Sequence, residues 1–434
     1  MSSTLIPTDV VVQAPSLLSD YSTSPGWPDW IQEMQQAAAA TFHSLPMPTR
    51  RDEAWRFSDL KRIDLSPYVN SGFPGGSCDW QARSLGLDSV AARFIYANDE
   101  LVSREVIDLP PGVVLQPLGQ AAVEHEAVVR EHFMREQVRL GSAKFAALHL
   151  ARLATGTFLH IPKNVRIDAP IEIFHWVEGE NVAVFPHTLI VCGENSQATV
   201  VEHFLSADGQ PALACAVNDL HVGRGASLTY VTRQEWSRDT LCFHLNATRV
   251  ARDASALALQ ANLGGAYVRT ENLSRLLGEG GRSDMLAVSP GSGDQFFDQR
   301  TFQEHAAPHT TSDLLFVNAL DDRSRSVFSG LIRADEGAHF IDAYQKARNL
   351  LLSPQAEADS LPGLEIQADR VKCTHGATTG AIDPEQIFYL LARGIAPREA
   401  RRLITLGFLG DALKRLPSDA IRMFLDEAIA RRLA

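Results

Sequence analysis

The residues best placed to do chemistry are Cys373 and His375, which lie two positions apart in the segment 371–377. If this segment is a β-strand, both side chains point to the same face, because side chains alternate from face to face along a strand. A thiolate and an imidazole together suit iron, zinc or copper. Two donors make half of a tetrahedral site, so the others would come from elsewhere in this chain or from a partner.

The same pair also has a purely structural explanation. Cys373 would pack as a small apolar side chain, and His375 would be hydrogen-bonded at the end of the strand region. Spacing alone favours this explanation over a metal site, so the pair needs support from the elements around it.

The elements that must position this pair form a long run of short strands. From Gly156 to about Val371 the sequence alternates short apolar and polar runs, bounded by Gly, Asn, Asp and Pro, which is typical of β-strands. Similar strand units begin 29 residues apart, at Ser196, Gly225, Ala254, Ser283 and Ser312. A fixed period with no helices between the strands predicts a β-solenoid, in which each coil buries its apolar face on the next.

Helical patterns lie on both sides of the strands. Residues 27–45 and 116–152 predict helices before the strands. In the block between them, Trp55 and Phe57 are interpreted as an aromatic anchor for the N-terminal arm. After Asp383, cap residues and prolines predict three further helices.

The chain is therefore expected to be mostly β, with three parts. Residues 1–110 form an N-terminal helical region with a flexible arm. Residues 111–375 form the β-solenoid core, with a helical lead-in to about residue 152. Residues 376–434 form a C-terminal helical domain.

The composition excludes several classes of protein. The chain has 434 residues and a net charge of −12, which argues against binding to nucleic acid or to an anionic membrane. It has no P-loop, no Gly-rich dinucleotide motif, no HExxH zinc motif and no nucleophile-elbow motif. Five scattered cysteines without a CxxC pair, and no secretory leader pattern, predict a soluble cytoplasmic protein.

Four segments carry a resemblance to a known family. They are RDEAWRFSDL at Arg51–Leu60, HTTSDLLF from His309, FSGLI at Phe328–Ile332 and the long block Gln345–Ile395, which includes the Cys373–His375 pair. Together they resemble the SufB/SufD family of iron–sulfur cluster assembly proteins, and they extend from about residue 50 to the end of the chain.

The resemblance implies a scaffold subunit with a right-handed parallel β-helix. Such a subunit pairs through its β-helix with a SufB-like paralogue and carries the ABC-type ATPase SufC on its C-terminal helices. It is not an enzyme alone, since ATP hydrolysis belongs to SufC. His375 would be a residue of the cluster or iron site at the interface, with Cys373 beside it. No cofactor would be tightly bound; iron or an iron–sulfur cluster would be held transiently.

Further expectations concern partners and location. The sequence leaves open whether the chain pairs with itself, as a homodimer, when it is isolated from its paralogue. It would act in the cytoplasm, or in the plastid stroma if it came from a plastid-bearing source. The helices after Pro397 combine an apolar face with arginines, and core packing or partner docking would each explain this. The resemblance favours docking of SufC, through Arg398, Arg401, Leu403, Leu406, Phe408 and Phe424.

Two departures favour the SufD branch over the SufB branch. SufB-type chains carry a sulfur-accepting Cys shortly after an Arg-Asn pair, whereas Arg348 and Asn349 are followed by a segment without Cys. SufB-type chains also read EHEATT where this chain reads KCTHGATT. Both departures argue against a sulfur-accepting role for this chain alone.

Two alternatives remain open at this point. A solitary β-helix enzyme, such as a carbohydrate lyase or an acyltransferase, is disfavoured because the repeats show no acidic cluster and no hexapeptide period. A structural adaptor with a vestigial site would keep its partners after both Cys373 and His375 were replaced.

Overall fold

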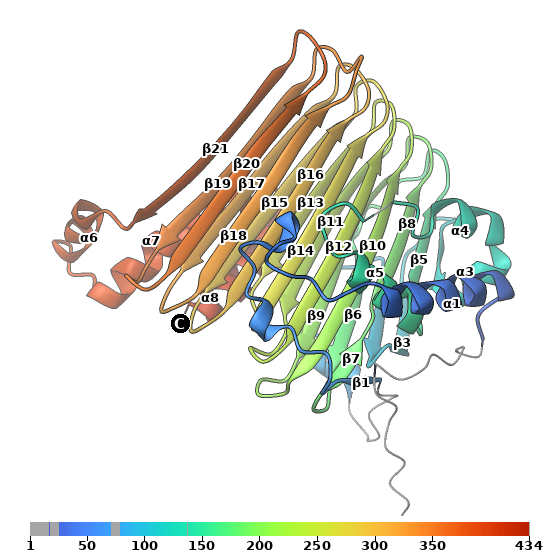
Figure 1. Cartoon of the computed structure of the whole chain (residues 1–434), viewed down its shortest axis with the longest axis horizontal. Coiled ribbons are helices and arrows are strands. Elements are labelled where there is room, and N and C mark those ends of the chain that lie inside the picture. The colour runs from blue at the N-terminus through green and yellow to red at the C-terminus, as the bar shows by residue number, and fades with distance from the viewer. Residues whose placement is uncertain (1–16, 18–25, 71–78, 137, 434) are drawn as a thin grey trace, which may run out of the picture.

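The computed structural model describes Leu17 and residues 26–70, 79–136 and 138–433. Most of the predicted N-terminal arm, and Cys78, lie outside these residues. Strands account for 42% of the chain and helices for 22%. The chain forms a β-solenoid of about eight turns with helices at both ends (Figure 1), so the predicted fold class is confirmed.

Two sheets make up the solenoid, and from β8 onward the chain alternates between them from strand to strand. Sheet A contains β1 (Val69–Asn70), β4 (Val114–Pro117), β5 (Thr157–Ile161), β7 (Val182–Val184), β8 (His187–Cys192), β10 (Ala212–Val222), β12 (Leu241–Val250), β14 (Tyr267–Leu276), β16 (Phe296–His305), β18 (Arg325–Ala334) and β20 (Glu357–Ile366). Sheet B contains β2 (Ala92–Ala97), β3 (Glu100–Val106), β6 (Ile171–Val177), β9 (Gln197–Ser206), β11 (Ser227–Glu235), β13 (Ser255–Asn262), β15 (Arg282–Gly291), β17 (Thr311–Leu320), β19 (Asp342–Leu351) and β21 (Lys372–Ala381).

The register of sheet B explains the repeat seen in the sequence. Ser283 and Ser312, which begin two of the predicted units, are direct partners on β15 and β17. Other coils differ slightly in length. The coil from Ser255 to its partner Arg282 is shorter, and the coil from Thr311 to its partner Asp342 is longer. The period of 29 residues is therefore the average length of one coil.

Helices cover both outer faces of the solenoid. They are α1 (Asp29–Ser44), α2 (Trp80–Arg83), α3 (Leu118–Glu124), α4 (Glu126–His132), α5 (Ala143–Arg152), α6 (Pro384–Leu391), α7 (Pro397–Leu413) and α8 (Asp419–Arg432), with short 3-10 turns at Glu53–Trp55 and Leu60–Arg62. The N-terminal region, α1 and α5 lie over sheet A in Figure 1, with α7 and α8 on the opposite side. There, Leu409, Leu413 and Leu425 pack against Val231 and Leu315 of sheet B. In the described part of the chain, no helix is both long and apolar enough to cross a membrane.

The segment around Trp55 is attached to sheet A, whereas most of the N-terminal arm that it is predicted to anchor lies outside the described residues. Trp55 is buried, and its indole N–H donates to the carbonyl of Gly141 at 3.0 Å. The guanidinium of Arg269 lies 3.6 Å from the centre of the Trp55 ring and forms a 2.6 Å ion pair with Asp298. Ser58 donates a short hydrogen bond to the same carboxylate. A fully buried cation is thereby paired and covered, which makes the attachment costly to break.

Inside the solenoid, amide side chains form a ladder that runs toward the last coil. Asn318 accepts a hydrogen bond from Gln299 at 3.1 Å and donates to Asn349 at 2.8 Å. Asn349 in turn donates to the hydroxyl of Thr379 on β21 at 3.2 Å. Since buried polar groups need partners, this ladder ties the last strand to the coils beneath it.

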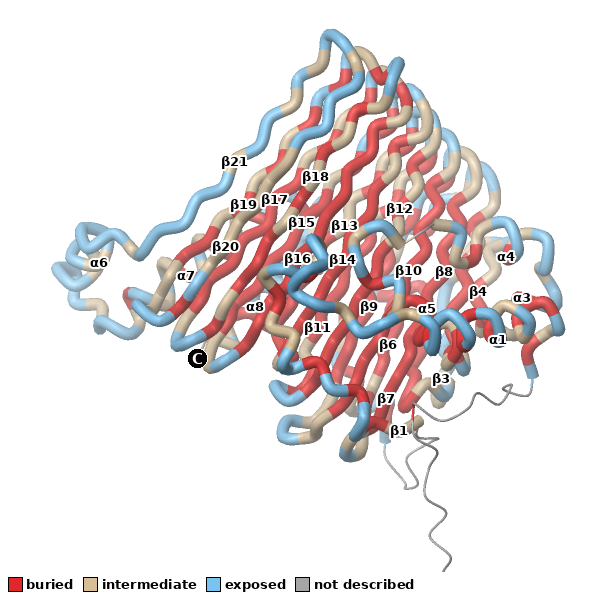
Figure 2. Tube along the Cα trace, in the orientation of Figure 1, coloured by how far each residue is buried: buried red, intermediate tan, exposed pale blue. Residues whose placement is uncertain are grey.

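The two ends of the solenoid differ. At the N-terminal end, the capped end, β3 runs antiparallel to β2, and β4 runs antiparallel to β5. Arg104 of β3 donates to the carbonyl of Leu115 on β4 at 3.1 Å, which joins the two sheets across this end. At the C-terminal end, the open end, β20 and β21 are the last strands of their sheets, and Figure 2 shows β21 largely exposed.

Candidate functional site

The structure places Cys373 and His375 on β21, so the predicted strand and the shared face are confirmed. Their register partners on β19 are Ala343 and Gln345. Partners on adjacent parallel strands point in the same direction. The orientation of the β19 residues therefore fixes the orientation of the pair.

Both β19 partners face the interior of the solenoid. Gln345 is fully buried, and its amide donates to the carbonyl of Gly330, on sheet A, at 3.3 Å. Ala343 is buried as well. Cys373 and His375 therefore point into the space that a further coil would enclose, between β20 and β21. His375 is exposed because no further coil covers it among the described residues.

Cys373 lies in a partly apolar environment. It packs beside Ala334, Ala338 and Ile341 and is half-buried. Burial, followed by the nearby carboxylate of Asp342, raises the pKa of its thiol above the usual value. The thiol is therefore protonated at neutral pH. A cation or metal ion that binds beside it would lower this pKa and stabilise the thiolate.

The opposite side of the open end is apolar, and the sequence did not indicate its importance. Leu364 and Ile366 of β20 pair with Ile332 and Ala334 of β18, which are fully buried. Leu364 and Ile366 thus face the same space as Cys373 and His375, yet they are 38% and 40% exposed. Their alternation in the sequence resembles that of any core strand, and only their position on the last coil distinguishes them.

Cys373 and His375 alone would offer a metal ion at most two donors. Among the described ranges, no group of three or more His, Cys, Asp or Glu side chains is arranged to hold a metal ion. Cys373 and His375 supply one sulfur and one nitrogen donor, a set that suits iron. Further donors would have to enter from the open side.

The six predicted docking residues divide into two groups. Arg398, Arg401 and Leu403 are exposed on α7, and the Arg401 guanidinium donates to the carbonyl of Leu352 at 3.3 Å. The remaining three are half-buried and pack toward sheet B; they are Leu406, Phe408 and Phe424.

The packing of the inward group explains how α7 and α8 attach to the solenoid. The guanidinium of Arg348 lies 4.6 Å from the centre of the Phe408 ring. Arg233 lies 4.8 Å from the centre of the Phe424 ring, which also contacts the ring of His203 edge-on. These aromatic side chains hold the helices in place, so any docking face must lie on the other side.

Helix α6 carries the exposed apolar residues that the sequence analysis did not single out. No residue of this helix is buried, and Phe388, Tyr389 and Leu391 are 72%, 56% and 38% exposed. In Figure 1 the helix projects beyond the end of β21. The apolar run FYLL in the second half of this helix was the available signal, but the same run would also fit a helix that packs against a core.

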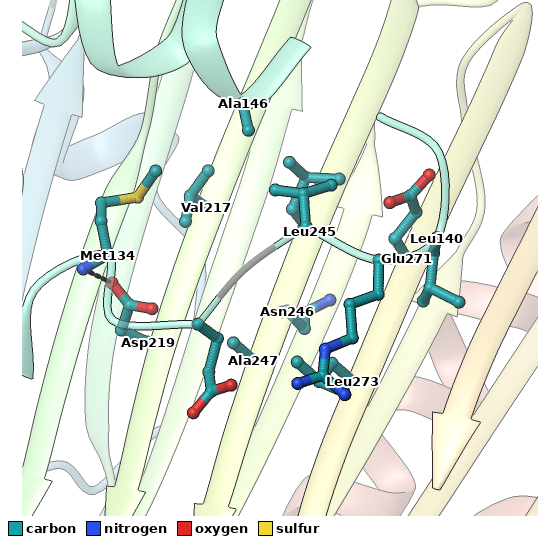
Figure 3. A pocket seen from close by; sticks show the side chains of 13 residues that line it. Met134, Leu140, Ala146, Val217, Asp219, Leu245, Asn246, Ala247, Glu271 and Leu273 are labelled. Atoms are coloured by element: carbon teal, nitrogen blue, oxygen red, sulfur yellow. Dashed lines mark hydrogen bonds between the residues drawn. The ribbon is translucent and has the colours of Figure 1, made fainter. Parts of the chain in front are cut away.

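A separate pocket of about 50 Å³ lies on the outer face of sheet A (Figure 3). Met134, Leu245 and Leu273 contribute to its apolar lining. At its rim, Glu136 forms ion pairs with Arg249 at 2.8 Å and with Arg275 at 3.1 Å. This small pocket lies where the chain between α4 and α5 crosses the sheet, away from the open end.

Comparison with known proteins identifies the class of protein. Residues 175–408 match the family model described as the SufBD core domain of the SUF system for iron–sulfur cluster assembly. The match covers more than half of the chain, and the chain belongs to this family.

Similar proteins extend the match over nearly the whole chain. The chain is 27% identical over 427 residues to the iron–sulfur cluster assembly protein SufD of Bacillus subtilis, covering 96% of this chain and 97% of that protein. It is 27% identical over 423 residues to a SufBD family protein of Synechocystis, covering 92% and 90% of the two chains. A SufBD family protein of Staphylococcus epidermidis is 26% identical over 425 residues, with 93% and 90% covered. The predicted family is confirmed.

Proposed function

We propose that this chain is a non-ATPase scaffold subunit of the SufD type, acting in the cytoplasm, which assembles iron–sulfur clusters together with a SufB-like paralogue and the ATPase SufC. One observation carries the proposal. Cys373 and His375 project into the unfinished last coil of the solenoid, beside two exposed apolar residues of β20. A partner that completes this coil would bury all four side chains at once.

The open end supports pairing through the β-helices. The outer edges of β20 and β21 are the last edges of their sheets, and an unpaired edge offers backbone N–H and C=O groups to another strand. A SufB-like paralogue that adds its own terminal strands would extend both sheets. In its absence, a second copy of this chain could use the same edges, which would make the isolated protein a homodimer.

The two donors suit a shared, transient site. Cys373 and His375 would contribute one thiolate and one imidazole, and the paralogue would contribute the remaining ligands. Iron and the finished cluster pass through this site as substrate and product. Because the Cys373 thiol is protonated in the isolated chain, binding of iron would release its proton.

The C-terminal helices support binding of SufC. Arg398, Arg401 and Leu403 are exposed on α7, while Phe388 and Tyr389 are exposed on α6. Aromatic and arginine side chains are enriched among the residues that dominate protein interfaces. We assign the docking surface to these outward residues, with Leu406, Phe408 and Phe424 holding the helices from beneath.

Cluster assembly by the reconstituted three-protein complex tests the proposal. His375→Ala should abolish or strongly slow the appearance of cluster absorbance, because one ligand of the shared site is lost. His43→Ala is the matched control, since His43 is exposed on α1, far from β21. Full-rate assembly by His375→Ala, in a complex of unchanged composition, would show that the site role is wrong.

A further inference from the structure

Gln345 is a buried polar residue directly beneath His375. The two are register partners on β19 and β21, and neighbouring strands lie about 4.8 Å apart. Gln345 is fully buried, and its carbonyl oxygen Oε1 has no hydrogen-bond partner. Its amide nitrogen donates to the carbonyl of Gly330. A buried acceptor without a partner is costly and calls for an explanation.

The structure leaves a gap for this amide on the opposite strand. A Cβ atom at Gly330 would lie 2.6 Å from Gln345 Oε1 and 2.6 Å from Thr301 Oγ1. Thr301 Oγ1 is also buried without a partner. Two unpaired oxygens therefore border one gap, which only a glycine leaves free.

The residues around the gap identify the group that can reach Gln345. On the coil below, the register partner of Gln345 is Leu314, which has no polar side-chain atom. On the open side, Gly330 pairs with Pro362 and Gln345 pairs with His375. On the open side of this ladder, His375 is the neighbour that can donate a hydrogen bond, whereas the other donor bordering the gap is the Thr301 hydroxyl on the opposite sheet.

Resting on the proposed function, we infer that Gln345 is a positioning residue for His375. Once a partner encloses the open end, Gln345 Oε1 accepts the N–H of one imidazole nitrogen, which fixes the orientation of the ring and directs the other nitrogen toward the open end. Ligating histidines are commonly oriented in this way by an acceptor on their second nitrogen, and loss of that acceptor costs about 10- to 100-fold in metal affinity or activity.

The test uses the reconstituted complex with this chain alone labelled with ¹⁵N-histidine. Cluster assembly rate and the ¹⁵N hyperfine coupling of the reduced cluster are measured for Gln345→Leu and Gln345→Glu. Leucine removes the acceptor and should slow assembly about tenfold or more, with loss or change of the nitrogen coupling. Glutamate, which burial keeps protonated, retains an acceptor oxygen and an O–H donor for the Gly330 carbonyl and should restore both readouts.

Gln303→Leu is the matched control. Gln303 is also fully buried with an unpaired Oε1, and its amide reaches across the interior to Ser312 at 2.8 Å. It pairs with Ile332, not with a residue of the candidate site. This variant should assemble clusters at the unmodified rate, and size-exclusion profiles of all variants establish that the complexes form.

The outcomes separate the inference from the proposed function. Slow assembly and altered coupling in Gln345→Leu, with rescue by Gln345→Glu, support the inference. If His375→Ala abolishes assembly but Gln345→Leu leaves rate and coupling unchanged, the inference is overturned while the proposed function stands. Equal losses in Gln345→Leu and Gln303→Leu would also overturn it, because general damage to the interior would explain both. Full activity of His375→Ala would overturn the proposed function and the inference with it.

Discussion

The two ends of the solenoid differ in whether the last strands and the core residues beneath them are covered. At the capped end, β3 and β4 reverse direction, Arg104 joins the two sheets, and Phe94 and Tyr96 are buried. At the open end, β20 and β21 leave core-facing residues such as Leu364 exposed. Since an unprotected edge invites pairing, the difference supports the proposal that one end terminates the fold and that the other, which carries Cys373 and His375, binds a partner.

Truncating one core residue at each end should give the largest difference between the two ends, measured as the loss in the free energy of unfolding. Phe94→Ala removes a fully buried ring at the capped end and should lower the free energy of unfolding by about 3–5 kcal/mol. Leu364→Ala removes a side chain that is 38% exposed and should cost about 1 kcal/mol in the isolated chain, scaled to its smaller buried area. Urea denaturation followed by circular dichroism measures both. Equal losses would mean that the open end is as well packed as the capped end.

A charge placed at each end should separate stability from association. Leu364→Asp should weaken binding to the SufB-like paralogue by about 2 kcal/mol or more, roughly 30-fold, because pairing would bury the new carboxylate. Val106→Asp, on β3 at the capped end, is the control, since Val106 is 49% exposed. Isothermal titration of each variant with the paralogue gives the affinities. Wild-type affinity in Leu364→Asp would place the interface elsewhere.

Replacement of an exposed aromatic residue beside the open end should affect the ATPase and not the paralogue. Phe388→Ala on α6 should weaken binding of SufC by about 1–2 kcal/mol, the range of a moderate interface residue. Val123→Ala on α3 removes a side chain that is 62% exposed near the capped end and should change nothing. Pull-down titrations with SufC measure the effect. Weaker SufC binding in Val123→Ala alone would place the SufC surface at the capped end and not beside the open end.

The smallest expected effect concerns the reactivity of Cys373. Burial and then Asp342 raise the pKa of its thiol, so its alkylation in the isolated chain should become fast only as the pH rises through this raised value. Asp342→Asn removes a negative charge, should lower the pKa of the thiol and should speed alkylation about twofold at pH 8. Mass spectrometry of iodoacetamide-treated protein, with Cys78 replaced by Ser, gives the rates. Slower alkylation in Asp342→Asn would contradict the electrostatic argument.

The sequence contains enough information to predict the solenoid but not its ends. The 29-residue interval between Ser283 and Ser312 follows directly from strand register, and the cap at Asp383 correctly predicted the start of α6. The region 1–110 also contributes β2 and β3, joined by Asn98 and Asp99 in left-handed conformations. That pair is a recognisable hairpin signal, but it is short beside the helical patterns around it.

The candidate site could be predicted only in part. The spacing of Cys373 and His375 fixes their common face, whereas their inward direction depends on the contact between Gln345 and Gly330 across two sheets. The importance of Leu364 depends on where the last coil stops. The packing of Phe408 and Phe424 toward sheet B is likewise a tertiary feature, so amphipathic spacing alone could not separate them from the outward residues Arg398 and Leu403.

Hydrogen–deuterium exchange on this chain, alone and mixed with the SufB-like paralogue, tests the central claim most directly. If the open end is the pairing edge, backbone amides of Glu357–Ile366 and Lys372–Ala381 should gain protection on mixing, while those of Glu100–Val106 at the capped end should not change. Protection confined to the capped end, or binding of the paralogue without protection of β20 and β21, would contradict the account.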